Sequence, residues 1–545
     1  MATEQKFLWW QQEVVYQVYP RSFQDSNGDG VGDLNGIRMR LDHLVELGIK
    51  AVWLSPIFPS PMADFGYDIS DYKDIHPLFG TMADFDKLIQ DIHARGMKLI
   101  LDLVPNHTSN QHPWFIESRS SRDNPKRDWY LWRDAKPDGG VPNNWRAAFG
   151  GPAWEWDEHT GQYYYHAFLK EQPDLNWRNP QVQEAMFDVM RFWLDRGVDG
   201  FRIDVLWHLI KDATFRDNPA NADYQPYMAT YDELLPVFST DQHEVHDIVQ
   251  QMRRLLDTYE DRMIIGEIYL PIHKLVTYYG TQNNGAHLPF NFQLITLPWM
   301  AKQISAAVHE YEGALPAQGW PNWVLGNHDQ PRIVSRVGQE QARVAAMMLL
   351  TLRGTPTIYY GDEIGMRDVP IPQNEIQDPQ GLNMPDKNLS RDPARTPMPW
   401  TEQANGGFTT ANKPWLRLDR NATMVNVDRE RKDPFSMLSL YERLIHLRQQ
   451  QPALRIGNYT PVYADHQIFA YMRTWQDAPS FIVVLNLTHR TASFRPPLSF
   501  RGVIEISTSP EIEGQRVQDR IELGGDEGLI IRLDSAPVPV TTQTP

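Results

Sequence analysis

The sequence places three carboxylates directly after short apolar segments. Asp204 follows "VDGFRI", Glu267 follows "MIIG", and Asp329 follows "WVLGNH". A buried carboxylate is costly unless it is paired or functional, so any one of the three could be half of a structural ion pair. Several such segment ends together, with two histidines and an arginine, favour a functional site. The polar residues at these ends are Asp102, Asn106, His107, Arg202, Asp204, Glu267, His328, Asp329, Asp362 and Glu363.

Cleavage of a glycosidic bond is the chemistry that fits this set best, because it requires one protonated and one ionised carboxyl. Arg202, two residues before Asp204 on the same strand face, would hold Asp204 ionised, and burial would keep Glu267 protonated near neutral pH. The sequence lacks G-x-S-x-G, the phosphate-binding glycine patterns and H-E-x-x-H. His107 and His328 are candidate metal ligands, but the fixed charge of Arg202 disfavours a catalytic cation beside them.

Eight apolar segments rich in Val, Ile and Tyr would position these residues. Several precede amphipathic helical patterns, such as 34–48 and 82–96, and Thr81 is a candidate N-cap for the second. Most are apolar on both faces, as buried parallel strands are. Eight βα units predict an α/β fold, a (β/α)8 TIM barrel whose active site lies at the carboxyl ends of its strands. The predicted strands are 14–20, 51–56, 98–104, 198–205, 263–269, 290–295, 323–328 and 355–363.

Two parts of the chain depart from this βα rhythm. Residues 105–175 are rich in Pro, Asn, Trp and Tyr, which predicts a small domain inserted after the third strand. From about residue 458 the helical pattern gives way to short strands and turns, typical of a C-terminal antiparallel β-sandwich domain. The predicted division is a barrel of residues 1–104 and 176–457, an inserted domain of residues 105–175 and a β domain of residues 458–545.

The composition excludes several other classes of protein. A net charge of −17 argues against binding to nucleic acid, which needs clustered Lys and Arg. The absence of Cys excludes disulfides, thiolate metal sites and Cys nucleophiles. No apolar run reaches the roughly 18 residues of a membrane helix, and the N-terminus "MATEQKFLWWQQEVVYQ" has no signal-peptide pattern. A cytoplasmic protein with no membrane partner is therefore expected.

Four short regions resemble those of glycoside hydrolase family 13, the α-amylase family. They are "DLVPNH" (102–107), "GFRIDV" (200–205), "GEIY" (266–269) and "VLGNHD" (324–329), in the family's order. The resemblance implies that Asp204 is the catalytic nucleophile, Glu267 the general acid/base and Asp329 a third carboxylate that binds sugar hydroxyls. It also implies double displacement with retention, for which the first two carboxyls lie roughly 5–5.5 Å apart. The implied ligands of the first sugar are Asp64, Tyr67, His107, Arg202 and His328.

Narrower features resemble the oligo-1,6-glucosidase and α-glucosidase branch of that family. "QPDLNW" (172–177) is similar to its signature, and Phe168 matches an aromatic residue that lines the sugar pocket. "RDPARTPMPW" (391–400) is similar to its pocket-closing segment, in which Arg395, more than Arg391, would reach towards the substrate. Val205, after the proposed nucleophile, is a residue that in this branch accompanies α-1,6 activity.

The stretch "DSNGDGVGD" (25–33) begins like an EF-hand loop, but Gly36 stands where the bidentate Glu is needed and a predicted strand precedes it. The same resemblance instead implies a structural Ca2+ or Mg2+ between the first strand and the first helix. The alternative is a loop of Asx turns without an ion. No catalytic metal or organic cofactor is expected. The implied ligands are Asp25, Asn27, Asp29, the carbonyl of Val31, and Asp33.

These patterns leave three hypotheses for function. The favoured one is a retaining α-glucosidase that hydrolyses terminal α-linked glucose from disaccharides or short oligosaccharides, with some transglucosylation. The second is a transglucosylase or a sucrose/maltose isomerase on the same scaffold. The third is a non-enzymatic scaffold or a transporter-subunit relative, against which the intact Asp204, Glu267 and Asp329 argue. In the first two cases the partners are small-molecule α-glucosides.

Overall fold

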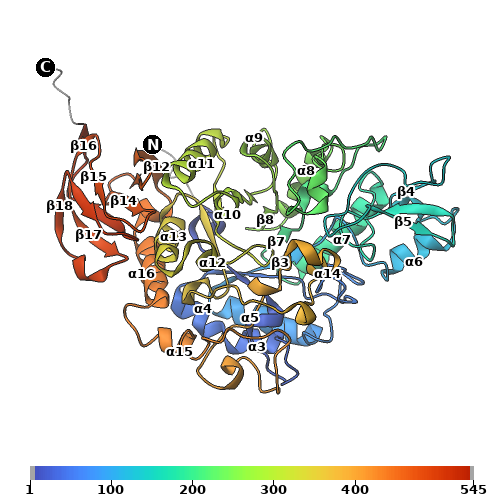
Figure 1. The fold of residues 1–545 in the computed structure, drawn as a ribbon, viewed down its shortest axis with the longest axis horizontal. Coiled ribbons are helices and arrows are strands. Elements are labelled where there is room, and N and C mark those ends of the chain that lie inside the picture. Colours follow the sequence, from blue (N-terminus) through green and yellow to red (C-terminus); the bar gives the residue numbers. More distant parts are fainter. Residues whose placement is uncertain (1–6, 540–545) are drawn as a thin grey trace.

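A computed structural model of the chain describes residues 7–539 (Figure 1). Its centre is an 8-stranded sheet in the order β10-β11-β1-β2-β3-β7-β8-β9, with every neighbouring pair parallel. A parallel bridge between Asn291 and Trp323 joins the two ends, so the sheet closes into a barrel. The predicted (β/α)8 fold is confirmed. The strands are β1 (Val15–Val18), β2 (Ala51–Leu54), β3 (Lys98–Leu103), β7 (Gly200–Ile203), β8 (Met263–Gly266), β9 (Leu288–Pro289), β10 (Asn322–Val324) and β11 (Thr355–Tyr359).

The sixth strand differs from the prediction. The observed strand, β9, ends before the predicted segment 290–295 begins, and residues 293–295 of that segment belong to a helical turn, α10 (Gln293–Thr296). The side chain of Asn291 accepts a hydrogen bond from the backbone N–H of Gln293 at 3.0 Å. This Asx turn ends the extended backbone and starts the helix, a competition that Asn side chains commonly win.

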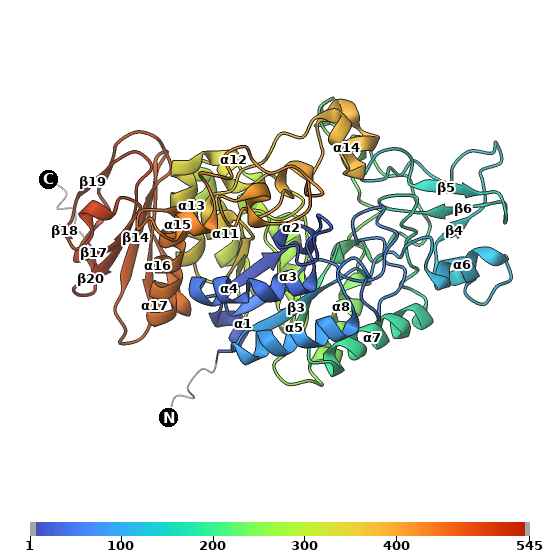
Figure 2. The ribbon, with the colours of Figure 1, turned by 90° about the horizontal axis from the view of Figure 1, so that it is seen from below.

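Helices surround the barrel on its outer face (Figures 1 and 2). Thr81 caps α5 through a reciprocal capping box with Asp84, as predicted. The predicted helix 34–48 is two helices that break at Arg40, and Gly48, in the left-handed region at φ 89°, ends the second. The longer helices are α3 (Leu34–Met39), α4 (Leu41–Leu47), α5 (Met82–Ala94), α7 (Pro180–Asp195), α8 (Val245–Leu256), α11 (Ala301–Ala314), α13 (Gln339–Thr351) and α16 (Met437–Gln450).

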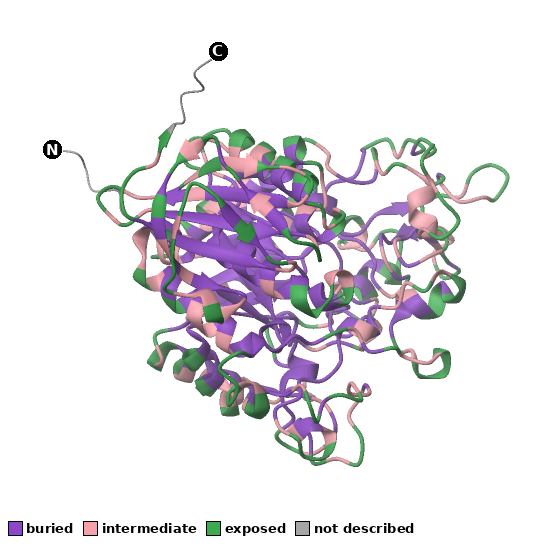
Figure 3. Cartoon of the chain, turned by 60° about the vertical axis from the view of Figure 1, so that its left-hand side comes forward, coloured by how far each residue is buried: buried purple, intermediate pink, exposed green. Residues whose placement is uncertain are grey.

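The core has an inner and an outer layer, which follow from the period of two along each strand. Trp53, Ile100 and Ile265 point into the barrel, where they form one cluster. Their neighbours along the strands, such as Val52 and Ile264, pack outward against the helices in a second and larger cluster. Figure 3 shows the strands of this interior as buried, and the one partly exposed position in them is Lys98 at the start of β3. Because both faces are covered, the strands are rigid supports for the side chains at their ends.

The segment between β3 and β7 forms a small antiparallel sheet in the order β4-β6-β5, with α6 (Pro113–Ser120) beside it. Figures 1 and 2 show it at the opposite end of the molecule from the C-terminal strands. We keep residues 105–175 as the proposed bounds of the inserted domain, between the two barrel parts 1–104 and 176–457. The strands are β4 (Trp132–Arg133), β5 (Trp154–Asp157) and β6 (Gln162–Tyr165).

The C-terminal part is the predicted antiparallel β structure, a six-stranded sheet ordered β12-β13-β14-β20-β17-β18 with two small strand pairs beside it. Along β13, Phe469 and Tyr471 pack towards the barrel, whereas Ile468 and Ala470 belong to a separate cluster within the β domain. One face of the sheet is therefore fixed to the barrel. The bounds are β12 (Asn458–Ala464), β13 (Ile468–Thr474), β14 (Phe481–Asn486), β15 (Ala492–Phe494), β16 (Leu498–Ser499), β17 (Arg501–Ser507), β18 (Arg516–Gln518), β19 (Ile521–Leu523), β20 (Gly528–Leu533) and β21 (Val538–Pro539).

The structure bears only in part on the expectations about a signal peptide and a membrane helix. Residues 1–6, on which the expectation about the N-terminus partly rested, lie outside them. Among residues 7–539, no helix combines the length and the apolar character that crossing a bilayer requires.

Candidate active site

A cavity of about 1040 Å³ opens at the carboxyl ends of the barrel strands. Arg202 and Arg395 are the predicted catalytic and substrate-binding residues that do not line it; they lie behind its wall. The predicted residues that do line it are Asp64, Tyr67, His107, Phe168, Asp204, Glu267, His328 and Asp329. Side chains from six different strand ends or loops thus meet around one space, as the barrel topology requires.

The guanidinium of Arg202 joins three carboxyls below the cavity. Its Nη1 donates to Asp102 at 2.9 Å and to Asp204 at 2.8 Å. Its Nη2 lies 2.8 Å from Oε2 of Glu267, but without the alignment of a hydrogen bond. Arg202 is fully buried. Asp204 and Glu267, 63 positions apart along the chain by subtraction of their numbers, are therefore held by one cation.

Burial raises the pKa of both Asp204 and Glu267. For Asp204 the nearby charge of Glu267 adds to this rise, and for Glu267 the charge of Arg202 opposes it. Because the two carboxyls share one guanidinium, they titrate as a pair and not as independent groups. The pair therefore holds one proton at pH values where exposed carboxyls are ionised, which is the state that acid-assisted attack requires.

The backbone at Val205 fixes the second of these carboxyls. Its N–H donates to Oε2 of Glu267 at 2.8 Å. Val205 adopts φ 38° and ψ 48°, the left-handed region, which a β-branched residue rarely enters. Such strain persists where surrounding structure imposes it, and here it directs an N–H at a buried carboxyl.

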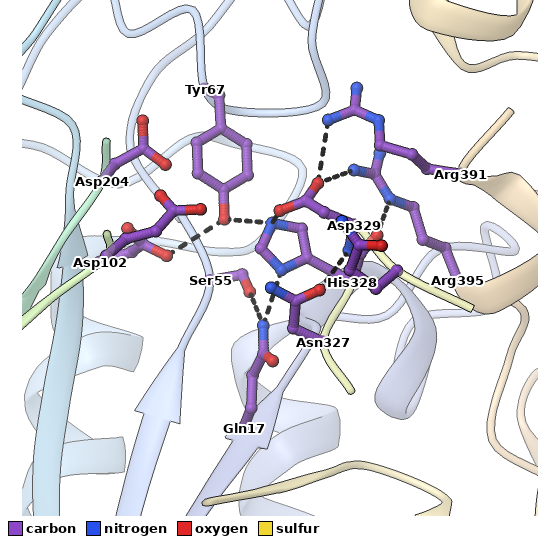
Figure 4. Close-up of polar contacts among 12 residues, drawn as sticks. Gln17, Ser55, Tyr67, Asp102, Asp204, Asn327, His328, Asp329, Arg391 and Arg395 are labelled. Atoms are coloured by element: carbon purple, nitrogen blue, oxygen red, sulfur yellow. Dashed lines mark hydrogen bonds and ion pairs between the residues drawn. The ribbon is translucent and has the colours of Figure 1, made fainter. Parts of the chain in front are cut away.

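Asp329 lies opposite, between two arginines (Figure 4). Its Oδ1 accepts from Arg391 at 3.0 Å and from Arg395 at 2.9 Å, and its Oδ2 lies 3.2 Å from Nε2 of His328. Burial favours the neutral acid, but His328, Arg391 and Arg395 together lower the pKa of Asp329 well below its ordinary range. Asp329 is therefore an anion, in contrast to the proton-sharing pair on Arg202.

His328 connects the two groups of carboxylates. The amide of Gln17 lies 2.9 Å from its Nδ1, and the hydroxyl of Tyr67 lies 2.6 Å from its Nε2 and donates to Asp102 at 3.1 Å (Figure 4). The rings of Tyr67 and His328 stack with centroids 5.2 Å apart. Burial lowers the pKa of His328 well below its ordinary value, so the ring is neutral. With the Gln17 amide donating to Nδ1, the proton of the neutral ring is on Nε2 and faces the cavity wall.

His107 is also neutral, because burial lowers its pKa to about 4. It lies against Phe168, with ring centroids 5.3 Å apart, and 3.2 Å from the amide of Gln172. In the part of the chain that the structure describes, neither histidine belongs to a group of three or more His, Asp or Glu side chains that could hold a metal ion.

Three predictions about individual residues change. Arg391 lines the cavity, whereas Arg395 lies behind Asp329 with its Nε on the carbonyl of His328, the reverse of the expected order. Asp362 and Glu363, counted among the rim residues, do not line the cavity. Glu363 instead accepts from Tyr16 at 2.7 Å and lies 3.0 Å from His43. The reason is a turn after β11 that directs both carboxylates outward, into the layer between barrel and helices.

The predicted metal loop follows β1 and packs against residues 407–415. Asp25 accepts backbone N–H groups from Asn27 at 2.9 Å, Gly28 at 2.7 Å and Gly30 at 2.8 Å, and Asp33 caps α3 through Gly36 at 2.7 Å. Within residues 7–539, no group of three or more His, Asp or Glu is arranged to hold a metal ion. The loop has the Asx turns of the ion-free alternative, and the cation stays a prediction.

The model of the α-amylase catalytic domain matches residues 17–457. This range contains every residue that lines the cavity and all of the barrel strands except the first two residues of β1. The chain belongs to the α-amylase family. The resemblance seen in the four short regions is confirmed. The cavity is lined by residues at the strand ends of the barrel together with Ala148, Phe149 and Phe168 from the segment between β3 and β7.

Relatives in two kingdoms place the chain within the family. An "Alpha-glucosidase" of Apis mellifera is 42% identical over 487 residues, covering 87% of this chain and 85% of its own length. An "Oligo-1,6-glucosidase" of Parageobacillus thermoglucosidasius is 41% identical over 527 residues, covering 90% and 92%. The branch indicated by the sequence is thereby confirmed.

Solved structures of similar proteins share the whole architecture. The α-glucosyl transfer enzyme XgtA superposes with a TM-score of 0.92 at 38% identity, covering 97% of this chain and all of its own. The trehalulose synthase MutB of Pseudomonas mesoacidophila superposes with a TM-score of 0.89 at 36% identity, covering 97% and 100%. Hydrolases and glucosyl-transferring enzymes therefore both occur among its relatives.

Proposed function

We propose that this protein is a retaining α-glucosidase that releases terminal α-linked glucose from disaccharides and short oligosaccharides. The observation that carries the proposal is the contact of Arg202 with both Asp204 and Glu267, each at 2.8 Å, beneath a cavity of about 1040 Å³. Double displacement needs two carboxyls that act on opposite atoms of one glycosidic bond. The relatives named for α-glucosidase and oligo-1,6-glucosidase activity support the same conclusion.

In the first step Asp204 is the nucleophile and Glu267 the acid. The Asp204 carboxylate attacks the anomeric carbon while Glu267 gives its proton to the glycosidic oxygen, so the carbon–oxygen bond breaks and the aglycone leaves as an alcohol. In the second step the Glu267 carboxylate takes a proton from water, which attacks the same carbon and releases Asp204. Two inversions give retention of configuration. The roughly 5–5.5 Å carboxyl separation of retaining enzymes is the distance that this assignment requires.

The remaining residues hold the glucose unit that is transferred. Asp329 is an anion fixed by two arginines, so it is suited to accept hydrogen bonds from sugar hydroxyls as charge develops on the ring. Tyr67 and Phe168 offer aromatic faces, and the neutral His107 and His328 offer polar atoms at the cavity wall. We further propose Asp64 as a second hydroxyl-binding carboxylate and Arg391 as the residue that joins it to Asp329.

Hydrolysis of a panel of glucose disaccharides tests the proposal. Substrates with α-1,2, α-1,3, α-1,4 and α-1,6 linkages are each expected to give glucose as the dominant product, with the α anomer formed first by NMR. Matching β-linked disaccharides serve as the control and are expected to be inert. Initial release of β-glucose, or no turnover of any α-glucoside, would contradict the proposal.

A second candidate is transfer of the glucosyl group to a sugar or another alcohol in place of water. The similarity to a glucosyl transfer enzyme and to a trehalulose synthase favours it as a side reaction. Incubation with concentrated sucrose, maltose or isomaltose, followed by product analysis, separates the two. Free glucose in excess of transfer products at low substrate concentration supports the hydrolase, and a dominant isomer or longer sugar supports the alternative.

We also propose that the loop of residues 25–33 binds a structural Ca2+ or Mg2+. Asn27 and Asp29 are exposed, and each uses its Oδ1 for one backbone N–H, at 2.9 Å and 2.8 Å, which leaves oxygen lone pairs for a hard cation. With the Val31 carbonyl, Asp25 and Asp33 they supply oxygens at alternate positions. A cation there would hold the loop against residues 407–415 near the rim.

Removal of divalent cations is expected to lower the melting temperature. A ligand present at 100 times its Kd stabilises the native state by about 2.7 kcal/mol, so EDTA-treated protein should melt at lower temperature and recover on addition of Ca2+. Differential scanning calorimetry measures both. Asp29→Ala is the matched control, because it removes one predicted ligand at an exposed site and should abolish the response to Ca2+. Equal melting temperatures with EDTA and with Ca2+ would rule out the ion.

A further inference from the structure

Asp378 lies outside the cavity but is tied to its wall. It precedes the short helix α14 (Pro379–Asn383), is fully buried and does not line the cavity. Its Oδ1 accepts from Nε of Arg391 at 2.9 Å and from Nη2 at 2.7 Å, and its Oδ2 accepts the backbone N–H of Arg391 at 2.8 Å. The carboxylate therefore holds both the backbone and the side chain of one arginine.

The other side of the same guanidinium faces the cavity. Nη2 of Arg391 also donates to Asp64 at 2.6 Å, and Nη1 donates to Asp329 at 3.0 Å. The ring of Phe149 lies 4.5 Å from the guanidinium carbon. A guanidinium is planar and its donors are fixed relative to one another, so the carboxylate behind it determines where its front nitrogens point.

We propose that Asp378 is a positioning residue of the glucose pocket, which orients Arg391 so that this arginine joins Asp64 to Asp329. The inference deepens the proposed function and rests on it, because the pocket is taken to bind glucose. Asp378 itself touches no substrate; it acts through Arg391.

The two pocket carboxylates depend on Arg391 to different degrees. Asp329 keeps two other partners, Arg395 at 2.9 Å and His328 at 3.2 Å. The side chain of Asp64 is held by Arg391 at 2.6 Å and by Gln172 at 3.2 Å. Displacing Arg391 should therefore disturb Asp64 more than Asp329. Loss of a contact made equally in the ground state and the transition state raises KM and leaves kcat unchanged.

The test is the steady-state kinetics of Asp378→Asn on the best disaccharide of the panel. Asn has one carboxamide oxygen in place of two carboxylate oxygens, so it cannot accept from both the side chain and the backbone N–H of Arg391. One of these two contacts is therefore lost, and the guanidinium is less well fixed. We expect KM to rise about 10-fold, a difference of about 1.4 kcal/mol in binding, with kcat within about threefold. A double-mutant cycle with Asp64→Asn should be non-additive, because Asp378 acts through the contact that Asp64→Asn already removes.

Asp362→Asn is the matched control. Asp362, like Asp378, is a buried aspartate outside the cavity and beside an arginine, with its Oδ1 3.7 Å from Arg332. Arg332, unlike Arg391, does not line the cavity. Asp362→Asn is expected to change the melting temperature and leave KM unchanged. A purely structural role of Asp378 would give the same result in Asp378→Asn, that is, lower thermal stability with unchanged KM, and this would overturn the inference.

Two further measurements keep the inference separate from the proposed function. Asp378→Glu retains the charge but moves the carboxylate by one methylene. It replaces Asp378→Asn in the test if Asp378→Asn does not fold. An unchanged KM in a variant that folds would reject the inference. Binding of glucose by calorimetry needs no turnover, and its Kd is expected to rise in parallel with KM. Absence of turnover by the unmodified protein would reject the proposed function, whereas equal glucose affinity in both proteins would reject only the role of Asp378.

Discussion

Asp204→Asn is expected to lower kcat/KM for α-glucosides by a factor on the order of 10⁴ to 10⁶, the range found when a covalent nucleophile is removed. In the unmodified protein Oδ1 of Asp204 lies 2.8 Å from Nη1 of Arg202. The amide of the variant has the same size and an oxygen that can accept from Arg202, but it cannot form the glucosyl ester. Steady-state hydrolysis of a disaccharide and of an aryl α-glucoside measures the loss.

Asp102→Asn is the control for this variant. Asp102 accepts from the same Nη1 of Arg202 at 2.9 Å, and burial raises its pKa to about 7, so an amide resembles its neutral form. Its loss should be about 10²-fold or less, as for a small displacement of the reacting groups. Equal losses in the two variants would show that the charge balance of Arg202, and not attack by Asp204, limits the reaction. Unchanged activity of Asp204→Asn would end the assignment.

Glu267→Gln should show a loss that depends on the leaving group. Removal of a general acid costs roughly 10²–10⁴-fold with disaccharides, whose leaving groups need protonation. An aryl glucoside with an acidic phenol leaves without help, so its glucosyl-enzyme forms and then hydrolyses slowly. Added azide should restore turnover and give the α-glucosyl azide, because azide needs no general base.

The pH profile of kcat/KM tests the protonation state of Glu267 independently. Since burial raises the pKa of Glu267, the acid keeps its proton above the ordinary range of glutamates, and activity falls as pH rises through this pKa. With an aryl glucoside, the alkaline limb should disappear in Glu267→Gln. Retention of that limb in the variant would assign it to another group.

Much of the barrel can be predicted from the sequence, because its strands are buried on both faces and end in polar residues. "VDGFRI" and "MIIG" predict both the strands and the positions of Asp204 and Glu267, and the structure brings these residues to one guanidinium. The sixth strand was wrong because its extended part is short and the Asx turn of Asn291 competes with it. A local side-chain hydrogen bond of this kind leaves little trace in a hydrophobic pattern.

The residues behind the cavity wall were harder to predict. Arg391 and Arg395 lie in an irregular loop without periodicity, so nothing in their spacing tells which one faces the cavity. Asp378 is 13 positions from Arg391, and only the folded loop shows that they pair. Gln17 did carry a signal, because one amide in the apolar strand "VVYQVYP" needs a buried partner, and that partner is His328.

The closure of the barrel has a consequence for its motions. β9 pairs with β8 at only two positions, Leu288 opposite Ile265 and Pro289 opposite Gly266, and Pro289 has no backbone N–H to donate. The chain after β9 meets β10 at a single bridge, between Asn291 and Trp323. Fewer main-chain hydrogen bonds mean a lower free energy of local opening, so this seam should exchange its amide protons faster than the long β2–β3 ladder. Glu267, the proposed acid/base residue, follows β8 directly, so its backbone adjoins the part of the barrel that we expect to open most readily, while the Val205 N–H holds its carboxyl.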